Sequence, residues 1–426
     1  MLTPGQILPL TIERPAAGGR MIARADGQVV LVGGAIPGER VTARIERVKK
    51  GLAYAETMSP DGPSPDRRPV VGDPLCGGCV YAHIAYPRQL ELKALVVADA
   101  FARIARLELP SAIRVAASPE DGYRMRARLH ARAGRLGFFR EGTHELCDAR
   151  ATKQLLSETC DVVERMSAAL RSAGLNEVRG VEICENVAAS ERVAHVDAAH
   201  GIDDRALRTL TSADGLTEGP YVTDVLVLGE RSPIRLRRHV LAFFQGNRYL
   251  LRDLVAHVVD QVPPAGAVLD LYAGAGLFSV AAAVTRSARV IAVEGDPFAA
   301  ADLEVNAAAS AAPVTAVHQA VEAFLGSVRL PFGGPQGRQP DRDHPDRDRP
   351  DAIILDPPRT GVSRDALDGV VRLGAARLIY VSCDVATLAR DARRLVDAGY
   401  ALDRLDAFDL FPNTPHVETV AVFVLR

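Results

Sequence analysis

Tryptophan is absent from this chain of 426 residues, and the basic residues are almost all arginines, with lysine only at Lys49, Lys50, Lys93 and Lys153. The formal net charge is −2 at pH 7, so any surface for nucleic acid depends on local clusters of arginine. Six scattered cysteines are too few for a disulfide framework in a chain of this length. The sequence has no apolar run of about 18 residues and no basic N-terminus followed by an apolar block. We therefore expect a soluble, cytoplasmic protein without a membrane span or a cleaved signal.

The length and the balanced composition predict several folded domains. Apolar residues make up 48% of the sequence and charged residues 24%, which is close to the average for globular proteins and excludes disorder throughout. A chain of 426 residues is too long for one ordinary core. We therefore expect two or three domains of about 100–200 residues each.

The N-terminal segment predicts a small β-barrel over residues 1–58. Short apolar runs at 29–32 and 41–48 are separated by glycine-rich turns, which is typical of closely spaced strands. Residues 60–74 are rich in proline, aspartate and arginine and predict a linker. Residues 75–240 then predict a mixed α+β central domain.

The C-terminal part, residues 241–426, predicts a parallel sheet with helices on both faces. Its buried strands alternate with helical patterns and are expected at Ala267–Leu271, Val290–Val293, Ala352–Leu355 and Leu378–Val381. Residues 331–350 are of low complexity, with no apolar residue after Phe332, and predict a disordered surface insertion. The fold class is therefore α/β with a doubly wound C-terminal domain.

The turn after the first of these strands predicts a nucleotide-type cofactor site. Gly274 and Gly276 form a Gly-x-Gly turn that lets the backbone approach a ligand, and Glu294 ends the next strand, where a carboxylate can accept both ribose hydroxyls. The third glycine of the dinucleotide fingerprint is missing. Asp270 lies four residues before the first glycine, and its charge would repel a pyrophosphate but suits the cationic amino-acid end of S-adenosylmethionine.

Three further loops place reactive side chains at the ends of strands. Asp356 precedes two prolines that stiffen its loop, Cys383 follows the strand at 378–381, and Glu418 lies in the last motif, at 409–419. Because the carboxyl ends of parallel strands meet at one edge of a sheet, we expect these loops to converge on one crevice.

The motifs DLYAGAG, DPPRTG, VSCDVATLARD and DLFPNTPHVET together resemble those of the S-adenosylmethionine-dependent RNA 5-methyluridine (uracil-C5) methyltransferases. The segment with Asp26-Gly27, Val32 and Ile36-Pro37-Gly38-Glu39 resembles the TRAM RNA-binding module that precedes the catalytic part in that family. The resemblance spans nearly the whole chain and is weakest over 150–240. It implies a class I, Rossmann-like methyltransferase domain at the C-terminus and a TRAM or OB-like barrel at the N-terminus.

The resemblance also implies roles for individual residues. Cys383 is the expected nucleophile that adds to carbon 6 of uracil, Glu418 is the expected base that removes the carbon-5 proton, and Asp356 orients the uracil or activates the thiol. The expected contacts of the cofactor S-adenosylmethionine are Gln245, Asp270, Tyr272, Gly274, Gly276, Glu294 and Asp356.

Two residues depart from the pattern of the family. Leu277 stands where many members have asparagine, which removes one expected cofactor contact. Asp384 follows the cysteine where asparagine is usual, and its charge is expected to raise the pKa of Cys383 unless Arg359 or Arg390 compensates.

A cysteine motif resembles the iron–sulfur site of several family members. Cys76 and Cys79 form a CxxC motif, and Cys147 fits the distant cysteine of the same site. A [4Fe–4S] cluster takes four thiolates, but Val70 stands where the family has its first cysteine. The alternatives are a labile cluster with another ligand (Cys160 is a candidate), a zinc site and a vestigial thiol pair, and in each case the three cysteines should lie close together.

Arginine clusters point to RNA, either ribosomal or transfer RNA, as the partner. Arg124, Arg126 and Arg128 alternate along an expected strand and so share one face, and the N-terminal module adds the basic residues Arg40, Arg44, Arg47, Lys49 and Lys50. We expect a monomeric, cytoplasmic methyltransferase into which the target uridine is flipped. The alternatives are methylation of another acceptor, such as cytosine-C5 or an amine, and a non-catalytic RNA-binding protein that senses the cofactor.

Overall fold

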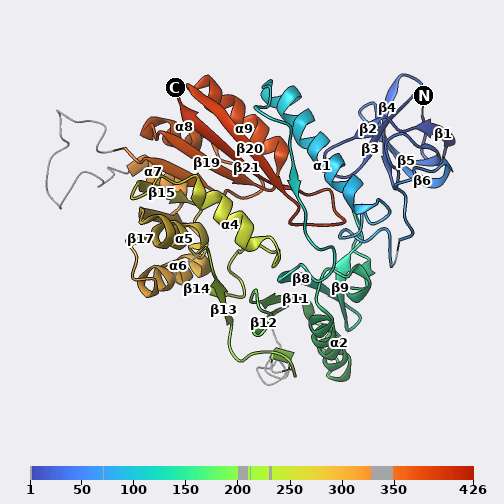
Figure 1. Ribbon diagram of the computed structural model, residues 1–426. Coiled ribbons are helices and arrows are strands. Elements are labelled where there is room, and N and C mark those ends of the chain that lie inside the picture. Colours follow the sequence, from blue (N-terminus) through green and yellow to red (C-terminus); the bar gives the residue numbers. More distant parts are fainter. Residues whose placement is uncertain (1, 71, 200–209, 212, 230–232, 328–348) are drawn as a thin grey trace.

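Figure 1 shows the computed structural model, coloured along the chain from blue at the N-terminus to red at the C-terminus. The structure describes residues 2–70, 72–199, 210–211, 213–229, 233–327 and 349–426. The insertion expected at 331–350 lies outside the described residues, except for its last two. Within the described residues, no helix is both long and apolar enough to span a bilayer.

The N-terminal unit is a six-stranded sheet. Along strand β5 (Arg40–Lys49), Val41, Ala43 and Ile45 are buried while the intervening Arg44 is exposed, as alternation in a strand with one buried face requires. The strands, in spatial order, are β1 (Ile7–Thr11), β5 (Arg40–Lys49), β6 (Leu52–Gly62), β4 (Gln28–Gly33), β3 (Met21–Ala25) and β2 (Arg14–Pro15).

The middle of the chain forms a five-stranded antiparallel sheet against which helix α2 (Ser157–Ser172) packs. Its strands, in spatial order, are β10 (Leu146–Cys147), β9 (Arg135–Phe139), β8 (Arg126–Arg132), β11 (Val178–Glu185) and β12 (Arg192–Ala198), and a short 3-10 helix, η2 (Arg150–Thr152), precedes α2. A separate two-stranded sheet follows, made of β13 (Tyr221–Leu226) and β14 (Ile234–His239).

The C-terminal unit is built on an eight-stranded sheet that contains all four expected buried strands. In spatial order, its strands are β17 (Val314–His318), β16 (Arg289–Glu294), β15 (Ala267–Leu271), β18 (Ala352–Leu355), β19 (Arg377–Ser382), β21 (Glu418–Leu425), β20 (Tyr400–Phe408) and β7 (Val115–Ala116). Neighbouring strands are parallel except at β21, which runs antiparallel to both of its neighbours.

Helices cover both faces of this sheet, which confirms the doubly wound fold. Alternate residues of β15 point to opposite faces, so that Val268 packs under one layer of helices and Leu269 under the other. The first layer contains α4 (Leu251–Asp260), α5 (Leu277–Arg286) and α6 (Pro297–Ala309). The second contains α1 (Tyr86–Ala100), its π-helical extension η1 (Phe101–Ala105), α7 (Val321–Ser327), α8 (Arg364–Leu373) and α9 (Val385–Asp397).

The expected boundary between the central and C-terminal domains differs from the structure. Helix α1 and strand β7 fall within residues 75–240, yet Val97 and Phe101 are buried in the core of the C-terminal sheet and β7 pairs with its edge strand β20. Figure 1 shows α1 beside α9 accordingly. Apolar residues such as Leu92, Val96 and Phe101 recur at helical spacing in the sequence, but this spacing does not specify which sheet the helix covers.

Helix α1 also holds the loop that connects β20 to β21. Lys93 is fully buried, and its Nζ donates hydrogen bonds to Asp409 Oδ1 and, at 3.1 Å, to the carbonyl oxygen of Phe411. One turn earlier, Gln89 Nε2 donates to Asn413 Oδ1 at 2.9 Å, and the Asn413 backbone N–H donates to Gln89 Oε1 at 3.0 Å. Two helix side chains therefore fix both the start and the middle of this loop.

Loss of the buried cation should destabilise the protein strongly. We expect Lys93→Met to lower the free energy of unfolding by about 3–5 kcal/mol, because Asp409 would remain buried without its partner. Urea denaturation followed by circular dichroism measures this change. The control is Arg393→Met, which breaks an exposed ion pair with Asp397 on α9 and should leave the unfolding midpoint nearly unchanged. Equal effects of the two variants would contradict the importance of the buried pair.

Candidate active site

A cavity of about 690 Å³ lies at the carboxyl ends of the strands of the C-terminal sheet, where the central domain faces it. Arg124, Arg126 and Arg128 line it from the central domain. Seven of the residues singled out in the sequence line it from the other side: Gln245, Tyr272, Gly274, Glu294, Asp356, Cys383 and Glu418. The expected convergence of the strand-end loops on one crevice is therefore present.

The two glycines after β15 have different tasks. Gly274 lines the cavity, and a Cβ placed on it would find only the carbonyl oxygen of Phe243, 3.8 Å away, so its backbone is open to a ligand. Gly276 begins α5 with φ +90°, and a Cβ there would lie 2.8 Å from Leu303 Cδ1. Gly276 is thus required for packing against α6 and does not itself line the cavity.

Asp270 lies behind the cavity surface and is fully buried. Its Oδ2 accepts a hydrogen bond from Ser279 Oγ, while its Oδ1 has no hydrogen-bond partner in the described part of the chain. Burial raises the pKa of Asp270 to about 7, and the hydrogen bond from Ser279 opposes this rise. A cationic ligand group nearby would favour the ionised carboxylate, which is what the amino-acid end of S-adenosylmethionine supplies.

Two carboxylates on the cavity wall are held by neighbours. Glu294 Oε2 accepts a hydrogen bond from the backbone N–H of Gly274 at 2.7 Å, and this bond connects the end of β16 to the glycine turn. Asp356 Oδ2 accepts a hydrogen bond from Gln245 Nε2 at 3.0 Å, and burial raises the pKa of Asp356 to about 7. These contacts place Gln245, Glu294 and Asp356 around one space, and the residues fit the expected cofactor.

Cys383 and Glu418 come together through strand register. Ser382, the last residue of β19, pairs with Thr419 of β21, and Thr419 Oγ1 donates to the Ser382 carbonyl oxygen at 2.9 Å. Cys383 directly follows β19 and Glu418 begins β21, so both lie next to this pair and both line the cavity. Glu418 is 2% exposed, and its burial, followed by repulsion from Asp356, raises its pKa well above the usual range.

The thiol of Cys383 has a raised pKa, as expected, but Asp384 is not the cause. Burial is the main cause and the carboxylate of Glu418 the next, and together they raise the pKa of Cys383 to about 11. Arg359 opposes the rise through its charge and a hydrogen bond. Asp384 instead caps α9, where its Oδ1 accepts from the Thr387 backbone N–H at 2.8 Å, and Arg390 is paired with Asp391.

Leu277 and the aromatic residues around the cavity complete the comparison with the sequence. Leu277 is the first residue of α5 and is buried in the core, where its side chain packs against other apolar side chains. Phe243 and Phe411 also line the cavity, and sequence analysis did not single them out as site residues. The sequence offered a signal for each of them: Phe243 lies two residues before Gln245, and Phe411 lies inside the last motif.

The three arginines of the central domain differ in their partners. Arg126 pairs with Glu182 at 2.9 Å and Arg128 with Asp197 at 3.1 Å. The guanidinium of Arg124 instead lies over the rings of Phe138 and Phe411, with its Cζ 5.7 and 5.9 Å from the ring centroids. All three face the cavity, which confirms that the alternation in the sequence brings them to one surface.

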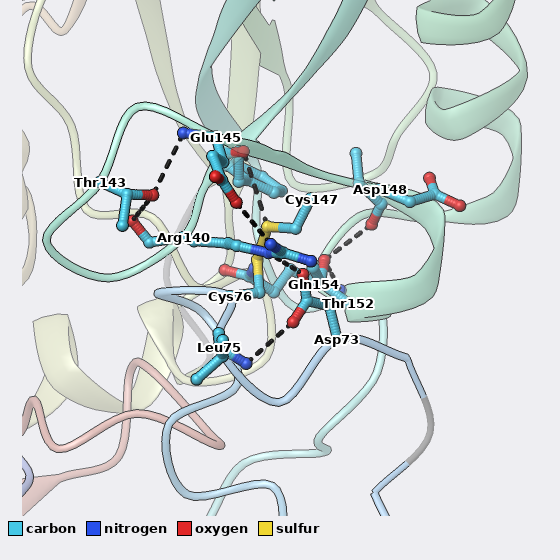
Figure 2. The surroundings of a disulfide bond; sticks show 12 residues. Asp73, Leu75, Cys76, Arg140, Thr143, Glu145, Cys147, Asp148, Thr152 and Gln154 are labelled. Carbon is cyan, nitrogen blue, oxygen red and sulfur yellow. Dashed lines mark hydrogen bonds and ion pairs between the residues drawn. A yellow bond between two sulfur atoms is a disulfide. The ribbon is translucent and has the colours of Figure 1, made fainter. Parts of the chain in front are cut away.

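Figure 2 shows that Cys76 and Cys147 are joined in a disulfide, with their Cα atoms 5.8 Å apart. Cys79 and Cys160 are free, buried thiols, and burial raises the pKa of each to about 11. No group of three or more His, Cys, Asp or Glu residues in the described ranges is arranged to hold a metal ion. Cys76 and Cys147 therefore lie together, as expected, and the backbone N–H of Cys79 donates to the carbonyl oxygen of Cys76 at 2.8 Å. Metal binding by these cysteines stays a prediction.

Comparison with known families agrees with this geometry. Residues 216–426 match the family described as tRNA (Uracil-5-)-methyltransferase, and residues 2–58 match the TRAM domain. The TRAM match covers the N-terminal sheet almost to its end, and the other match begins just before β13.

Relatives resemble the chain over almost its whole length. The 23S rRNA (uracil(1939)-C(5))-methyltransferase RlmD of Pseudomonas putida is 32% identical, over 97% of this chain and 93% of that protein. The protein of the same name from Pectobacterium atrosepticum is 30% identical, over 99% and 94%. The crystal structure of Pyrococcus abyssi tRNA (uracil-54, C5)-methyltransferase in complex with S-adenosyl-L-homocysteine has the same fold, with a TM-score of 0.74, 23% identity and coverage of 97% of this chain and 99% of that chain.

Removal of Arg359 should make Cys383 less reactive near neutral pH. Because the thiolate is the reactive form and Arg359 lowers the pKa of the thiol, Arg359→Leu should move the pH dependence of alkylation to higher pH. The measurement is the rate of iodoacetamide modification of Cys383, followed by peptide mass spectrometry between pH 7 and about 10. Arg390→Leu is the control and should leave this profile unchanged. An Arg359→Leu profile that matches the parent would contradict the assignment.

The cysteine arrangement predicts the number of free thiols. Denatured protein without reductant should expose four thiols, from Cys79, Cys160, Cys184 and Cys383, and reduction should raise the number to six. Titration with a thiol reagent, together with iron and sulfide analysis of anaerobically purified protein, measures this. Six thiols without reductant, accompanied by a full complement of iron, would show that the sulfurs bind a cluster instead.

Proposed function

The chain belongs to the S-adenosylmethionine-dependent RNA uracil-C5 methyltransferases, and we propose that the uridine it methylates lies in 23S ribosomal RNA. It transfers a methyl group from S-adenosylmethionine to carbon 5 of a uridine in RNA. The identity to the RlmD proteins of two genera extends through the TRAM and central units as well as the catalytic sheet, and this supports the same class of RNA substrate.

The cofactor is proposed to occupy the part of the cavity next to β15 and β16. Glu294 would hold the ribose, Gly274 would approach the ligand with its backbone, and Asp270 and Gln245 would hold the amino-acid end together with Asp356. Tyr272, whose φ is +63°, turns the chain so that Gly274 reaches the cavity. When bound, the cofactor supplies an electrophilic methyl group.

The first chemical task of the protein is to make carbon 5 of uracil nucleophilic. We assign this task to Cys383, whose thiolate adds to carbon 6 and moves the electrons of the 5,6 double bond onto carbon 5 as an enolate. Arg359 holds the negative charge of the thiolate before attack. Asp356, which accepts a hydrogen bond from Gln245, is proposed to accept another from the uracil ring.

The second task is to remove the proton from carbon 5 after the methyl group has been transferred. Glu418 begins β21 next to the end of β19, its charge acts on the Cys383 thiol, and its raised pKa makes its carboxylate a stronger base than an exposed glutamate. The proton passes to Glu418, the electrons of the broken C–H bond restore the 5,6 double bond, and the Cys383 thiolate leaves carbon 6. This pairing of Cys383 with Glu418 is the observation that carries the assignment.

The RNA is proposed to enter between the central domain and the catalytic sheet. Arg124, Arg126 and Arg128 line the cavity on the side opposite the catalytic loops, and the exposed basic residues of β5 are proposed as a second contact with the RNA backbone. A uridine flipped out of its helix could then reach Cys383. Because one chain supplies every residue of the site, we propose that the protein acts as a monomer, in the cytoplasm where ribosomal RNA is modified.

A trapped covalent complex tests both the substrate and the nucleophile. A 5-fluorouridine transcript of a 23S ribosomal RNA fragment should form a stable adduct with the protein and S-adenosylmethionine, because fluorine cannot leave carbon 5 as a proton does. Denaturing gel electrophoresis detects the adduct, and Cys383→Ala should abolish it while cofactor binding by calorimetry stays unchanged.

The matched RNA control is a 5-fluorouridine transfer RNA transcript, which should form little adduct. Preferential trapping of the transfer RNA would overturn the proposed substrate but leave the mechanism intact. Undiminished trapping by Cys383→Ala would overturn the role of this cysteine.

A further inference from the structure

The two-stranded sheet of β13 and β14 has one buried and one exposed face. Val222, Asp224 and Leu226 of β13 point inward, as do Ile234, Leu236 and Arg238 of β14, and all of them are buried. The outer face carries the alternate residues. From β13 these are Tyr221, Thr223 and Val225, and opposite them on β14 are His239, Arg237 and Arg235.

Aromatic rings and an arginine are assembled on this outer face. The ring of His239 is stacked on Phe298 of α6, with centroids 4.5 Å apart and an interplanar angle of 8°. Tyr221 meets His239 edge-on at 5.2 Å, and Arg237 Cζ lies 4.2 Å from the centre of the Tyr221 ring. The four side chains therefore form a continuous ladder in the order Phe298, His239, Tyr221, Arg237.

The ladder begins at the rim of the catalytic cavity. Asp296 and Ala299 line that cavity, and Phe298 lies between them at the start of α6. Strand β14 packs on α6, so the rest of the ladder extends from the rim across the β13–β14 sheet. Figure 1 shows these two strands between α6 and the central domain.

The ladder is not explained by packing of the protein core. Tyr221 is 39% exposed and Phe298 is 42% exposed, which is unusual for large rings that already contact one another. Arg237 NH2 forms an ion pair with Asp302 Oδ1 at 3.3 Å, and among the residues that the structure describes its buried Nε has no hydrogen-bond partner. His239 has a lowered pKa because of its burial, so it presents a neutral ring near pH 7.

We propose that Phe298, His239, Tyr221 and Arg237 form a stacking platform for unpaired nucleotides next to the target uridine. Exposed rings beside arginine are the combination with which proteins hold single-stranded nucleic acid, because every base has a π-face and every nucleotide a phosphate. The outer face also carries Arg235, which favours a polyanion over an apolar protein partner. The proposal rests on the proposed function and deepens it, since it specifies how the RNA beside the flipped uridine is held.

The test compares ring-removing with ring-retaining variants of the full-length protein. The probe is a fluorescein-labelled, single-stranded RNA with one uridine, whose affinity is measured by fluorescence anisotropy with S-adenosyl-L-homocysteine present. We expect Tyr221→Ala and Phe298→Ala each to weaken binding about tenfold, and Tyr221→Phe and Phe298→Tyr to bind as the parent does. Tyr221→Leu and Phe298→Leu keep apolar volume without a π-face and serve if an alanine variant fails to fold.

A second probe separates stacking from general loss of structure. The same RNA with abasic sites on both sides of the uridine should bind the parent and the alanine variants with equal affinity, because it has no neighbouring bases to stack. Leu95→Ala removes an exposed apolar side chain on α1 and should not change either affinity. In methylation assays the alanine variants should raise KM and leave kcat unchanged, because the platform does not touch the reacting atoms.

Several outcomes would overturn the platform. One is that the alanine variants bind intact RNA as tightly as the parent does. Another is that sedimentation shows a dimer that dissociates when Tyr221 is replaced, because a second copy of the chain would then cover this face. Failure of the proposed function is distinguishable: the parent would methylate no uridine in ribosomal RNA, while the anisotropy measurement would still report whether the rings bind bases.

Discussion

The buried contact between Lys93 and Asp409 is the constraint on which the geometry of the site depends. Both side chains are fully buried, and an ammonium and a carboxylate are stable without water only when they face each other and find further hydrogen bonds. The pair fixes the start of the connection between β20 and β21, and Gln89 fixes its middle through Asn413. Strand β21 begins with Glu418 directly after this connection. The contacts that helix α1 makes with the connection therefore position the proposed base.

The charged groups around the cavity affect both the binding of the cofactor and the ionisation of the Cys383 thiol. Asp270, Asp356 and Glu418 are buried carboxyls whose pKa values are raised, and Glu294 adds a fourth carboxylate at the cavity wall. Such a site favours a cationic cofactor and disfavours a thiolate: burial first, and the carboxylate of Glu418 next, raise the pKa of Cys383 to about 11. Arg359 is the charge that opposes this effect at the thiol, and the positive end of a bound cofactor would act in the same direction.

Much of the fold and of the site could be predicted from the sequence, because strands and strand-end motifs are local features. The strands at 267–271 and 352–355 follow from buried apolar runs. The loops after them were expected to converge because the sheet is parallel, but Glu418 reaches the cavity at the start of β21, which runs antiparallel to β19. Other features depend on contacts between distant segments. The sequence does not reveal that α1 covers the C-terminal sheet, that Asp384 caps a helix, or that Cys76 bonds to Cys147.

The central claim is that Cys383 and Glu418 act in succession on one uridine. Release of tritium from RNA that carries the isotope at carbon 5 of uridine tests this claim most directly, when it is measured together with methyl transfer. The account predicts one tritium released for each methyl group transferred by the parent protein. Glu418→Gln should transfer one methyl group, remain bound to the RNA through Cys383 and release no tritium. Release at the parental rate by Glu418→Gln would contradict the account, because another group would then remove the proton.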